Sequence, residues 1–284
     1  MISEEQLYKK NLIRTFKAFC EFCDLNDLTY FAAYGTALGA VRHNGIIPWD
    51  DDIDVCMPRK DYERLFEMEL PEGYQIRSLK DKGYWAPFAK WVNSNTTLWE
   101  EKSHPVIIGM YIDIFVLDEA GEEAQTTMKI VDSAARNFRR ANTNWTWSDI
   151  WNKMKGLHPM GFFRLLLDKV WYSNKKDYYT KKLVEAQDLA KNGTGDYLVS
   201  YNGPYLNREI NKKEWFCSTV KFPFEDFSVN VPVEYDSYLR QLYRDYMQFP
   251  PEEKRQSTHS HYYLNLDKGM TMEEVLLEIK EKQK

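Results

Sequence analysis

Cysteine is scarce in this chain, with four in 284 residues, which is too few for a disulfide-stapled secreted scaffold of this length. No window approaches about 18 consecutive apolar residues, so the sequence predicts no membrane span. The N-terminus, MISEEQLYKKNL, lacks the apolar segment of a signal peptide. We therefore expect a soluble protein of the cytoplasm, and the pattern leaves peripheral contact with the inner face of a membrane open.

Glycine and proline are also few, at 13 and 11, which excludes collagen-like and low-complexity chains. The chain has no basic excess, because its net charge is −5 at pH 7. Proteins that bind nucleic acid over a broad face usually carry such an excess, so we expect no nucleic-acid partner. What is abundant is apolar and aromatic: 43% of residues are hydrophobic and 15% aromatic, as in a globular protein with a large core.

Helical and strand-like segments alternate over the first 120 residues and predict an α+β fold. We expect a core domain over 1–120, a helical elaboration over 121–200 and a C-terminal part, 201–284, that packs back on the core in one compact body. The segment 197–204 is expected to be a loop. The predicted helices span 3–27, 36–42, 58–68, 233–247 and 271–282, and the predicted strands span 28–33, 52–57, 88–92 and 110–117.

Gly35 and Thr36 lie where a strand gives way to a helix. Glycine allows a ligand to approach the backbone, and the amides of a helix N-terminus together with a threonine hydroxyl can donate to phosphate. The pair therefore predicts a phosphate-binding turn.

Asp52 and Asp54 stand two residues apart in the predicted strand, so both carboxylates are expected on one face and Asp51 on the other. Two adjacent carboxylates repel each other unless a cation lies between them. The hard divalent ion used with phosphates is Mg²⁺, with Mn²⁺ as the alternative.

Asp113 is the candidate for a third carboxylate at this site, because it is the only charge in the apolar run YIDIF. A lone aspartate on a buried strand is costly unless it is paired or binds a metal. We therefore predict Asp52, Asp54 and Asp113 as both metal ligands and catalytic residues.

The same segment resembles the LicD family, which includes bacterial phosphocholine transferases and the eukaryotic fukutin-related proteins. The family pattern Gly-Thr-x-Leu-Gly-Ala-x-Arg-His, followed by Gly-x-Ile-Pro-Trp-Asp-Asp-Asp-Ile-Asp, occupies 35–43 and 45–54. One departure is Arg244, where the pattern has glycine. The resemblance covers most of the chain except 120–200, with further matches at 59–62, 88–90, 112–118 and 224–243.

The resemblance implies a nucleotidyltransferase-like mixed sheet with flanking helices and a divalent metal on the aspartate pair. It implies transfer of a phospho-substituent, with phosphocholine the leading candidate, from a CDP-linked donor such as CDP-choline. The implied acceptor is a sugar hydroxyl of a cell-surface glycan or its precursor, as in lipopolysaccharide, teichoic acid or capsule. CMP would leave, and Asp113 would act either as third ligand or as base. Further contacts to the donor diphosphate are predicted for Arg42, His43 and Lys90.

Two other functions fit the same residues. One is a nucleotidyltransferase that attacks the α-phosphate of a nucleoside triphosphate, and the other is a non-catalytic nucleotide- or glycan-binding protein. The head group also stays open between choline, ethanolamine, an aminophosphonate and an alditol. A quaternary ammonium is recognised by aromatic faces. The candidates for that contact are Trp49, Trp85 and Trp91.

Overall fold

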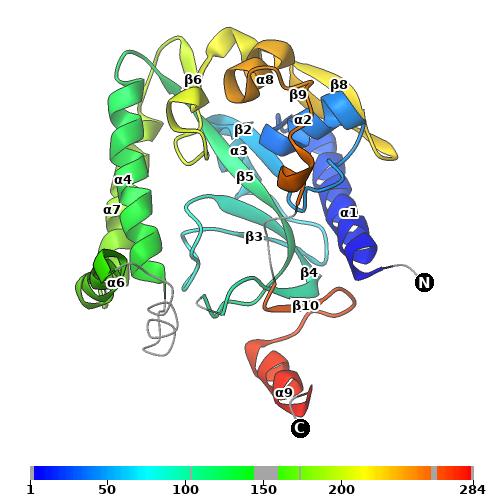
Figure 1. Cartoon of the computed structure of the whole chain (residues 1–284). Coiled ribbons are helices and arrows are strands. Elements are labelled where there is room, and N and C mark those ends of the chain that lie inside the picture. The colour runs from blue at the N-terminus through cyan, green and yellow to red at the C-terminus, as the bar shows by residue number, and fades with distance from the viewer. Residues whose placement is uncertain (1–2, 103, 144–158, 173, 257–260, 283–284) are drawn as a thin grey trace.

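A mixed sheet forms the centre of the molecule, and the computed structural model describes residues 3–102, 104–143, 159–172, 174–256 and 261–282 (Figure 1). Its main strand order is β1-β2-β5-β4-β10, with β3 added beside β4, β6 beside β5, and β7 beside β6. A separate hairpin pairs β8 with β9. The strands are β1 (Phe31–Ala32), β2 (Asp54–Pro58), β3 (Tyr74–Arg77), β4 (Ala89–Trp99), β5 (Ile108–Ala120), β6 (Tyr197–Val199), β7 (Ile210–Lys212), β8 (Thr219–Phe224), β9 (Phe227–Pro232) and β10 (Tyr263–Asn265).

Helices flank this sheet, and α4, α6 and α7 stand together as a group at its edge in Figure 1. The predicted α+β class is confirmed by this arrangement. The helices are α1 (Glu4–Leu25), α2 (Tyr34–His43), α3 (Arg59–Leu65), α4 (Ala124–Asn142), α6 (Pro159–Tyr172), α7 (Lys176–Lys191), α8 (Tyr235–Tyr243) and α9 (Met272–Lys282), with short 3₁₀ turns at Leu206–Glu209, Lys213–Phe216 and Glu252–Lys254.

Helix α1 begins at a capping box in which the Ser3 hydroxyl accepts from the Gln6 N–H and the Gln6 side chain accepts from the Ser3 N–H. Its buried face carries Phe16 and Phe19, which pack in the main core against β4 and β5. Cys20 and Cys23 lie on the same face as free, buried thiols, and burial raises the pKa of both. The helix is thus anchored by apolar packing.

The sheet places three charged residues side by side. Strands β2 and β5 run parallel with Asp54 beside Asp113, and β4 runs antiparallel to β5 with Lys90 beside Asp113. Because side chains alternate along a strand, register partners share a face. This pairing creates the charged centre of the candidate site.

Five strands, β3, β7, β8, β9 and β10, were not expected from the sequence, and one segment was predicted wrongly. Tyr197–Val199 is a strand on the edge of β5, where a loop was predicted. β3 and β10 are short strands beside β4, and the hairpin β8–β9 lies apart from the main sheet. Such short strands owe their conformation to the partner strand, so their own sequences carry little periodicity.

The β8–β9 turn closes the loop that follows α2. Glu225 adopts a positive φ of 56°, its N–H donates to the Asn44 carbonyl, and its carboxylate accepts from the Ile46 N–H at 3.0 Å. A Cβ at Gly45 would clash with that carboxylate, so a larger residue would displace the Glu225 side chain from the Ile46 N–H. The late part of the family pattern, at 224–243, therefore contacts and holds the loop within its early part, at 35–54.

Candidate functional site

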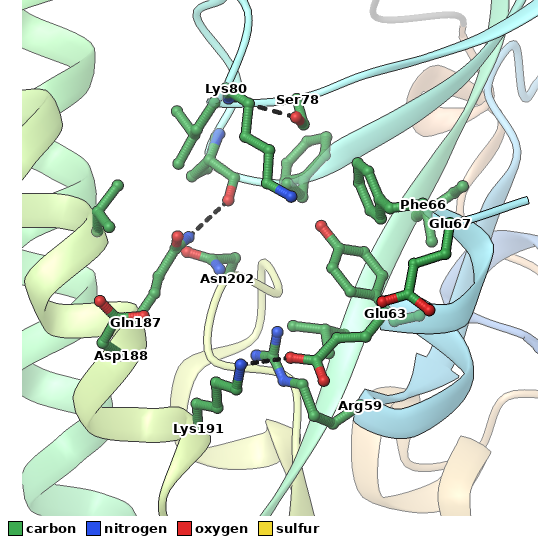
Figure 2. Close-up of a pocket in the computed structure, with 17 residues that line it drawn as sticks. Arg59, Glu63, Phe66, Glu67, Ser78, Lys80, Gln187, Asp188, Lys191 and Asn202 are labelled. Carbon is green, nitrogen blue, oxygen red and sulfur yellow. Dashed lines mark hydrogen bonds and ion pairs between the residues drawn. The ribbon is translucent and has the colours of Figure 1, made fainter.

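Two clefts lie on the described part of the chain near the charged centre. The larger, of about 560 Å³, lies between α3, β5 and α7 and is drawn in Figure 2. The other, of about 460 Å³, contains the predicted phosphate turn and aspartates, and we call it the acidic cleft. Its lining residues are Tyr34, Gly35, Leu38, Arg42, Ile47, Trp49, Asp50, Asp52, Asp54, Pro204, Tyr205, Tyr243, Asp245, Tyr246, Gln248 and Pro250.

The start of α2 is held in a strained turn. Tyr34 has a positive φ of 46°, which is costly for a non-glycine residue. Its N–H donates to the Tyr238 hydroxyl at 3.2 Å and its own hydroxyl donates to Glu209 at 2.9 Å. The backbone is therefore fixed from both sides, which sets the direction of the α2 N-terminus.

Gly35 and Thr36 connect this turn to the aspartates. A Cβ at Gly35 would lie 2.5 Å from the Asp50 carboxylate, so a larger residue would push that carboxylate away from its place against α2. The Thr36 hydroxyl accepts from the Asp54 N–H at 2.8 Å and is buried. Thr36 therefore positions the start of β2, and its predicted contact with a phosphate stays a prediction.

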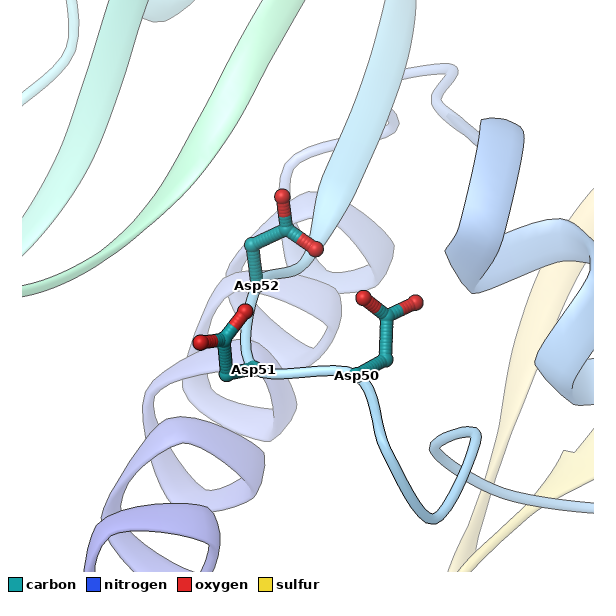
Figure 3. A group of neighbouring side chains, drawn as sticks. All are labelled: Asp50, Asp51 and Asp52. Atoms are coloured by element: carbon teal, nitrogen blue, oxygen red, sulfur yellow. The ribbon is translucent and has the colours of Figure 1, made fainter. Parts of the chain in front are cut away.

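Asp50, Asp51 and Asp52 lie close enough to share a metal ion, since one ligand atom from each lies within 4.8 Å of the others (Figure 3). The sequence placed Asp51 on the opposite face from Asp52, on the assumption that the strand begins at residue 52. That assignment was wrong, because β2 begins at Asp54 and strand alternation does not apply to the preceding loop. Asp50 was missed for the same reason.

Repulsion and burial both act on these carboxylates. Burial and then the neighbouring Asp52 charge raise the pKa of Asp50 to about 8. The same causes, joined by Asp113, raise the pKa of Asp54 well above its usual range. A divalent cation would offset this cost, and all-oxygen donors are what Mg²⁺ and Mn²⁺ prefer. The group of Asp50, Asp51 and Asp52 fits such an ion, whereas the predicted ligands Asp54 and Asp113 lie outside this group among the described residues.

Lys90 is tied to Asp113 rather than directed at open solvent. Its ammonium donates to the Asp113 carboxylate at 2.6 Å and lies 3.4 Å from the Tyr111 ring centroid, and the lysine is 3% exposed. Burial raises the pKa of Asp113 to about 6, against the opposing effect of Lys90. The ion pair with Lys90 therefore favours the ionised form of Asp113.

Arg42 and His43 lie at the C-terminal end of α2, against the loop that follows α8. Arg42 donates to the carbonyls of Tyr246 at 2.6 Å and Gln248 at 3.3 Å, and its guanidinium lies 4.7 Å from the Phe249 ring centroid. Burial, with Arg42 as a second cause, lowers the pKa of His43. Arg42 lines the acidic cleft while bracing its outer wall.

The three predicted tryptophans lie in different places. Trp49 lines the acidic cleft and contacts His43 and Phe249. Trp85 packs with a separate apolar cluster on Val92 and Leu98. Trp91 is 0% exposed and packs on Phe19, Phe22 and Tyr74 in the main core. The head-group role predicted for Trp91 is therefore wrong.

Several cleft residues come from the C-terminal part and were not predicted. Tyr205 and Tyr243 form a wall of the acidic cleft, and the Tyr205 hydroxyl donates to that of Tyr243 at 3.1 Å. Glu209 accepts from the Tyr205 N–H at 3.0 Å and from the Tyr34 hydroxyl at 2.9 Å. The matched Tyr243 of the family pattern was the signal that could have pointed to this wall.

The chain is similar in sequence to known proteins. Residues 27–144 match the family model described as LicD/FKTN/FKRP, nucleotidyltransferase domain. The lipopolysaccharide cholinephosphotransferase LicD of Haemophilus influenzae is 29% identical over 273 residues, which cover 91% of this chain and 96% of that protein. An uncharacterized protein of Rickettsia typhi is 40% identical over 74 residues, a local match that covers 25% of this chain and 24% of that protein.

The described helices include none long and apolar enough to cross a membrane, and the predicted contact with a membrane surface stays a prediction. The family model spans the phosphate turn, the three aspartates and Lys90, and the similarity to the Haemophilus protein extends over nearly the whole length of both chains. Over residues 27–144 the chain thus carries the sequence pattern of the LicD family.

Proposed function

We propose that this protein is a LicD-type phosphotransferase that moves phosphocholine from CDP-choline to a sugar hydroxyl of lipopolysaccharide or a related glycan. The observation that carries the proposal is that Asp52 and Asp54 line one cleft with Gly35 of the phosphate turn, and that Asp113 is the register neighbour of Asp54. The choline donor and lipopolysaccharide acceptor are suggested by the name of the Haemophilus relative.

Asp52 and Asp54 would hold one Mg²⁺ or Mn²⁺, which when bound supplies charge neutralisation at the diphosphate. Asp113 is the third carboxylate we propose, because it is the register neighbour of Asp54 and Lys90 favours its ionised form. Asp50 competes for that place, since it lies within metal-sharing distance of Asp52.

In the proposed reaction the sugar hydroxyl oxygen attacks the phosphorus of the phosphocholine group. The bond from that phosphorus to the oxygen of CMP breaks, and CMP leaves. A carboxylate beside the acceptor accepts the hydroxyl proton, and Asp113 suits this role as well as that of ligand. Lys90 is buried and donates to Asp113, so its proposed part in the reaction is to position that carboxylate.

Aromatic rings at the acidic cleft suit a quaternary ammonium, which cannot donate hydrogen bonds. Trp49, Tyr205, Tyr243 and Tyr246 line the cleft, and each ring contact with a cation contributes about 0.5–2 kcal/mol. Trp49 is the predicted head-group residue that this placement favours.

The experiment is a donor comparison with the purified protein and lipopolysaccharide oligosaccharide as acceptor, in Mg²⁺ or Mn²⁺. We expect CMP release from CDP-choline together with phosphocholine on the saccharide, and no transfer of label from α-labelled CTP. Asp52→Asn should lose the product, whereas Asp226→Asn, on the exposed β8–β9 turn, should retain it.

Label from CTP on the acceptor, with release of pyrophosphate, would instead establish a nucleotidyltransferase, which the description of the matching domain favours as the second candidate. Binding of CDP-choline without any product would mean a non-catalytic binding protein.

A further inference from the structure

The larger cleft, between α3, β5 and α7, has no part in the chemistry described above. It has a volume of about 560 Å³, which is enough for several sugar rings. Figure 2 shows residues of α3 on one side and of α7 on the other, with the ion pair Lys191–Glu63, at 2.5 Å, joining them.

Aromatic rings and planar polar groups face each other across this cleft. Tyr62 and Phe66 lie 5.1 Å apart between ring centroids, and the Lys80 ammonium lies 4.9 Å from the Phe66 centroid. On the opposite wall the Gln187 amide donates to the Pro87 carbonyl at 2.7 Å. The buried Asn202 Oδ1 has no hydrogen-bond partner among the described residues. Aromatic faces pack against the C–H face of a sugar ring, while amides and carboxylates bond its hydroxyls.

The charges of the cleft balance. Arg59, Lys80 and Lys191 stand against Glu63, Glu67 and Asp188. The acidic cleft instead has four aspartates and one arginine, and a bound cation would offset this excess of negative charge. A nucleoside diphosphate with its metal ion therefore fits the acidic cleft. A neutral polar ligand fits the larger cleft between α3, β5 and α7, which we call the balanced cleft.

One turn, residues 202–205, contributes to the lining of both clefts. Asn202 lines the balanced cleft, whereas Pro204 and Tyr205, two and three residues later, line the acidic one. Between them Gly203 lies against Tyr34, because a Cβ there would be 2.4 Å from the Tyr34 hydroxyl. The balanced cleft and the proposed donor site therefore share this turn.

We propose that the balanced cleft binds the neutral saccharide portion of the acceptor. That this saccharide is the acceptor of the reaction rests on the proposed function, whereas the binding of a neutral oligosaccharide by this cleft does not. Recognition would come from stacking on Tyr62 and Phe66 and from hydrogen bonds with Gln187 and Asn202.

The test uses two substitutions on one helix. Val184 and Leu189 both lie on α7 and are 39% and 53% exposed, so we expect tryptophan at either position to leave the core packing intact. Val184 lines the balanced cleft, and Leu189 lines a groove toward α4. Val184→Trp therefore fills the cleft, and Leu189→Trp is its matched control. Gln187→Ala is a second cleft variant, to be used if Val184→Trp lowers the melting temperature of the protein.

The probes are neutral oligosaccharides built from hexoses and N-acetylhexosamines, titrated by saturation-transfer NMR against the full chain. We expect at least one to bind wild type and Leu189→Trp equally, and Val184→Trp at least about tenfold more weakly. Gln187→Ala should weaken binding too. If no probe binds wild type, or if the cleft variants bind like the control, the proposal is overturned.

Donor turnover separates this proposal from the proposed function. Val184→Trp should leave CMP release from CDP-choline into water unchanged while raising the KM for the oligosaccharide acceptor. If wild type releases no CMP but Val184→Trp still weakens saccharide binding, the function fails and the saccharide cleft stands.

Discussion

At the scale of single residues, the aspartates lie closer together than their charges tolerate. Asp50 and Asp54 both have raised pKa values, with burial as the first cause and the Asp52 charge as the second. Their arrangement therefore makes sense only with a bound cation or bound protons. The clustered carboxylates before and at the start of β2 thus destabilise the folded state, as strained groups at functional sites commonly do.

We predict that Asp52→Asn and Asp54→Asn each reduce turnover by at least ~10²-fold, the scale of losing a key electrostatic group. Without metal, their thermal stability should equal or exceed that of wild type because like charges are relieved. Addition of Mn²⁺ should raise the melting temperature of wild type and not of either variant, as differential scanning fluorimetry can measure. A full Mn²⁺ shift in both variants would place the ion elsewhere.

The same measurement decides the third ligand. If Asp113 is the third ligand, Asp113→Asn abolishes the Mn²⁺ shift and Asp50→Asn only weakens it, whereas the reverse order would assign that place to Asp50.

The sequence predicted the site where local pattern determines geometry. Gly35, Thr36 and Asp54 follow from a strand-to-helix turn and a strand start, and the structure brings them together. Trp91 was misplaced although alternation could have excluded it, since it adjoins Lys90 and therefore faces away from Asp113. Asp50 could not be placed, because a loop has no period from which to infer direction.

At the scale of elements, the end of α8 departs from the family pattern. Arg244 stands where that pattern has glycine, and its backbone has φ 64° and ψ −113°, a conformation that glycine adopts and L side chains rarely do. The turn fixes Tyr243 and Tyr246, both of which line the acidic cleft. Arg244 thus adopts the backbone conformation expected of glycine, and it is strained in that conformation.

We predict that Arg244→Gly raises the free energy of unfolding by about 1 kcal/mol, because relief of backbone strain of ~1–3 kcal/mol exceeds the added freedom of glycine in the unfolded chain. Urea unfolding followed by fluorescence measures the change. Arg244→Ala keeps the Cβ and is the control. An equal gain in both variants would attribute the effect to the arginine side chain and not to the backbone.

Element prediction succeeded where a helix carries its own signals. Helix α9 begins where Thr271 and Glu274 cap each other, with the Thr271 N–H donating to Glu274 at 2.7 Å. Strand β10 carries no such signal, and its three residues pair with Trp99, Leu98 and Thr97 of a strand more than 160 positions earlier. Nothing in a sequence window records a partner so distant.

At the scale of the whole molecule, Glu209 joins the C-terminal part to the core. It is 1% exposed and accepts from Tyr34 at the start of α2 and from Tyr205 in the turn that the two clefts share. Burial raises the pKa of this carboxyl from 4.5 to about 8. The hydrogen bonds by which Glu209 connects Tyr34 to Tyr205 are therefore sensitive to the protonation of this carboxyl.

We predict that this residue makes the folded state less stable as pH rises. Between pH 4.5 and about 8 the folded protein holds a proton on Glu209 that the unfolded chain has lost, so stability falls by up to about 1.4 kcal/mol per pH unit. Glu209→Gln has no proton to lose. The variant should match wild type near pH 5 and become progressively more stable than wild type toward pH 8.5, as urea unfolding across that range can measure.

Asp50 and Asp113 also titrate in this window, with pKa values of about 8 and about 6, so each protein alone will show a slope. Both carboxylates are present in wild type and in Glu209→Gln, so the difference between the two curves isolates Glu209. A constant difference from pH 5 to pH 8.5 would mean that Glu209 is ionised in the folded protein, and that Tyr34 and Tyr205 are held by a charged carboxylate throughout.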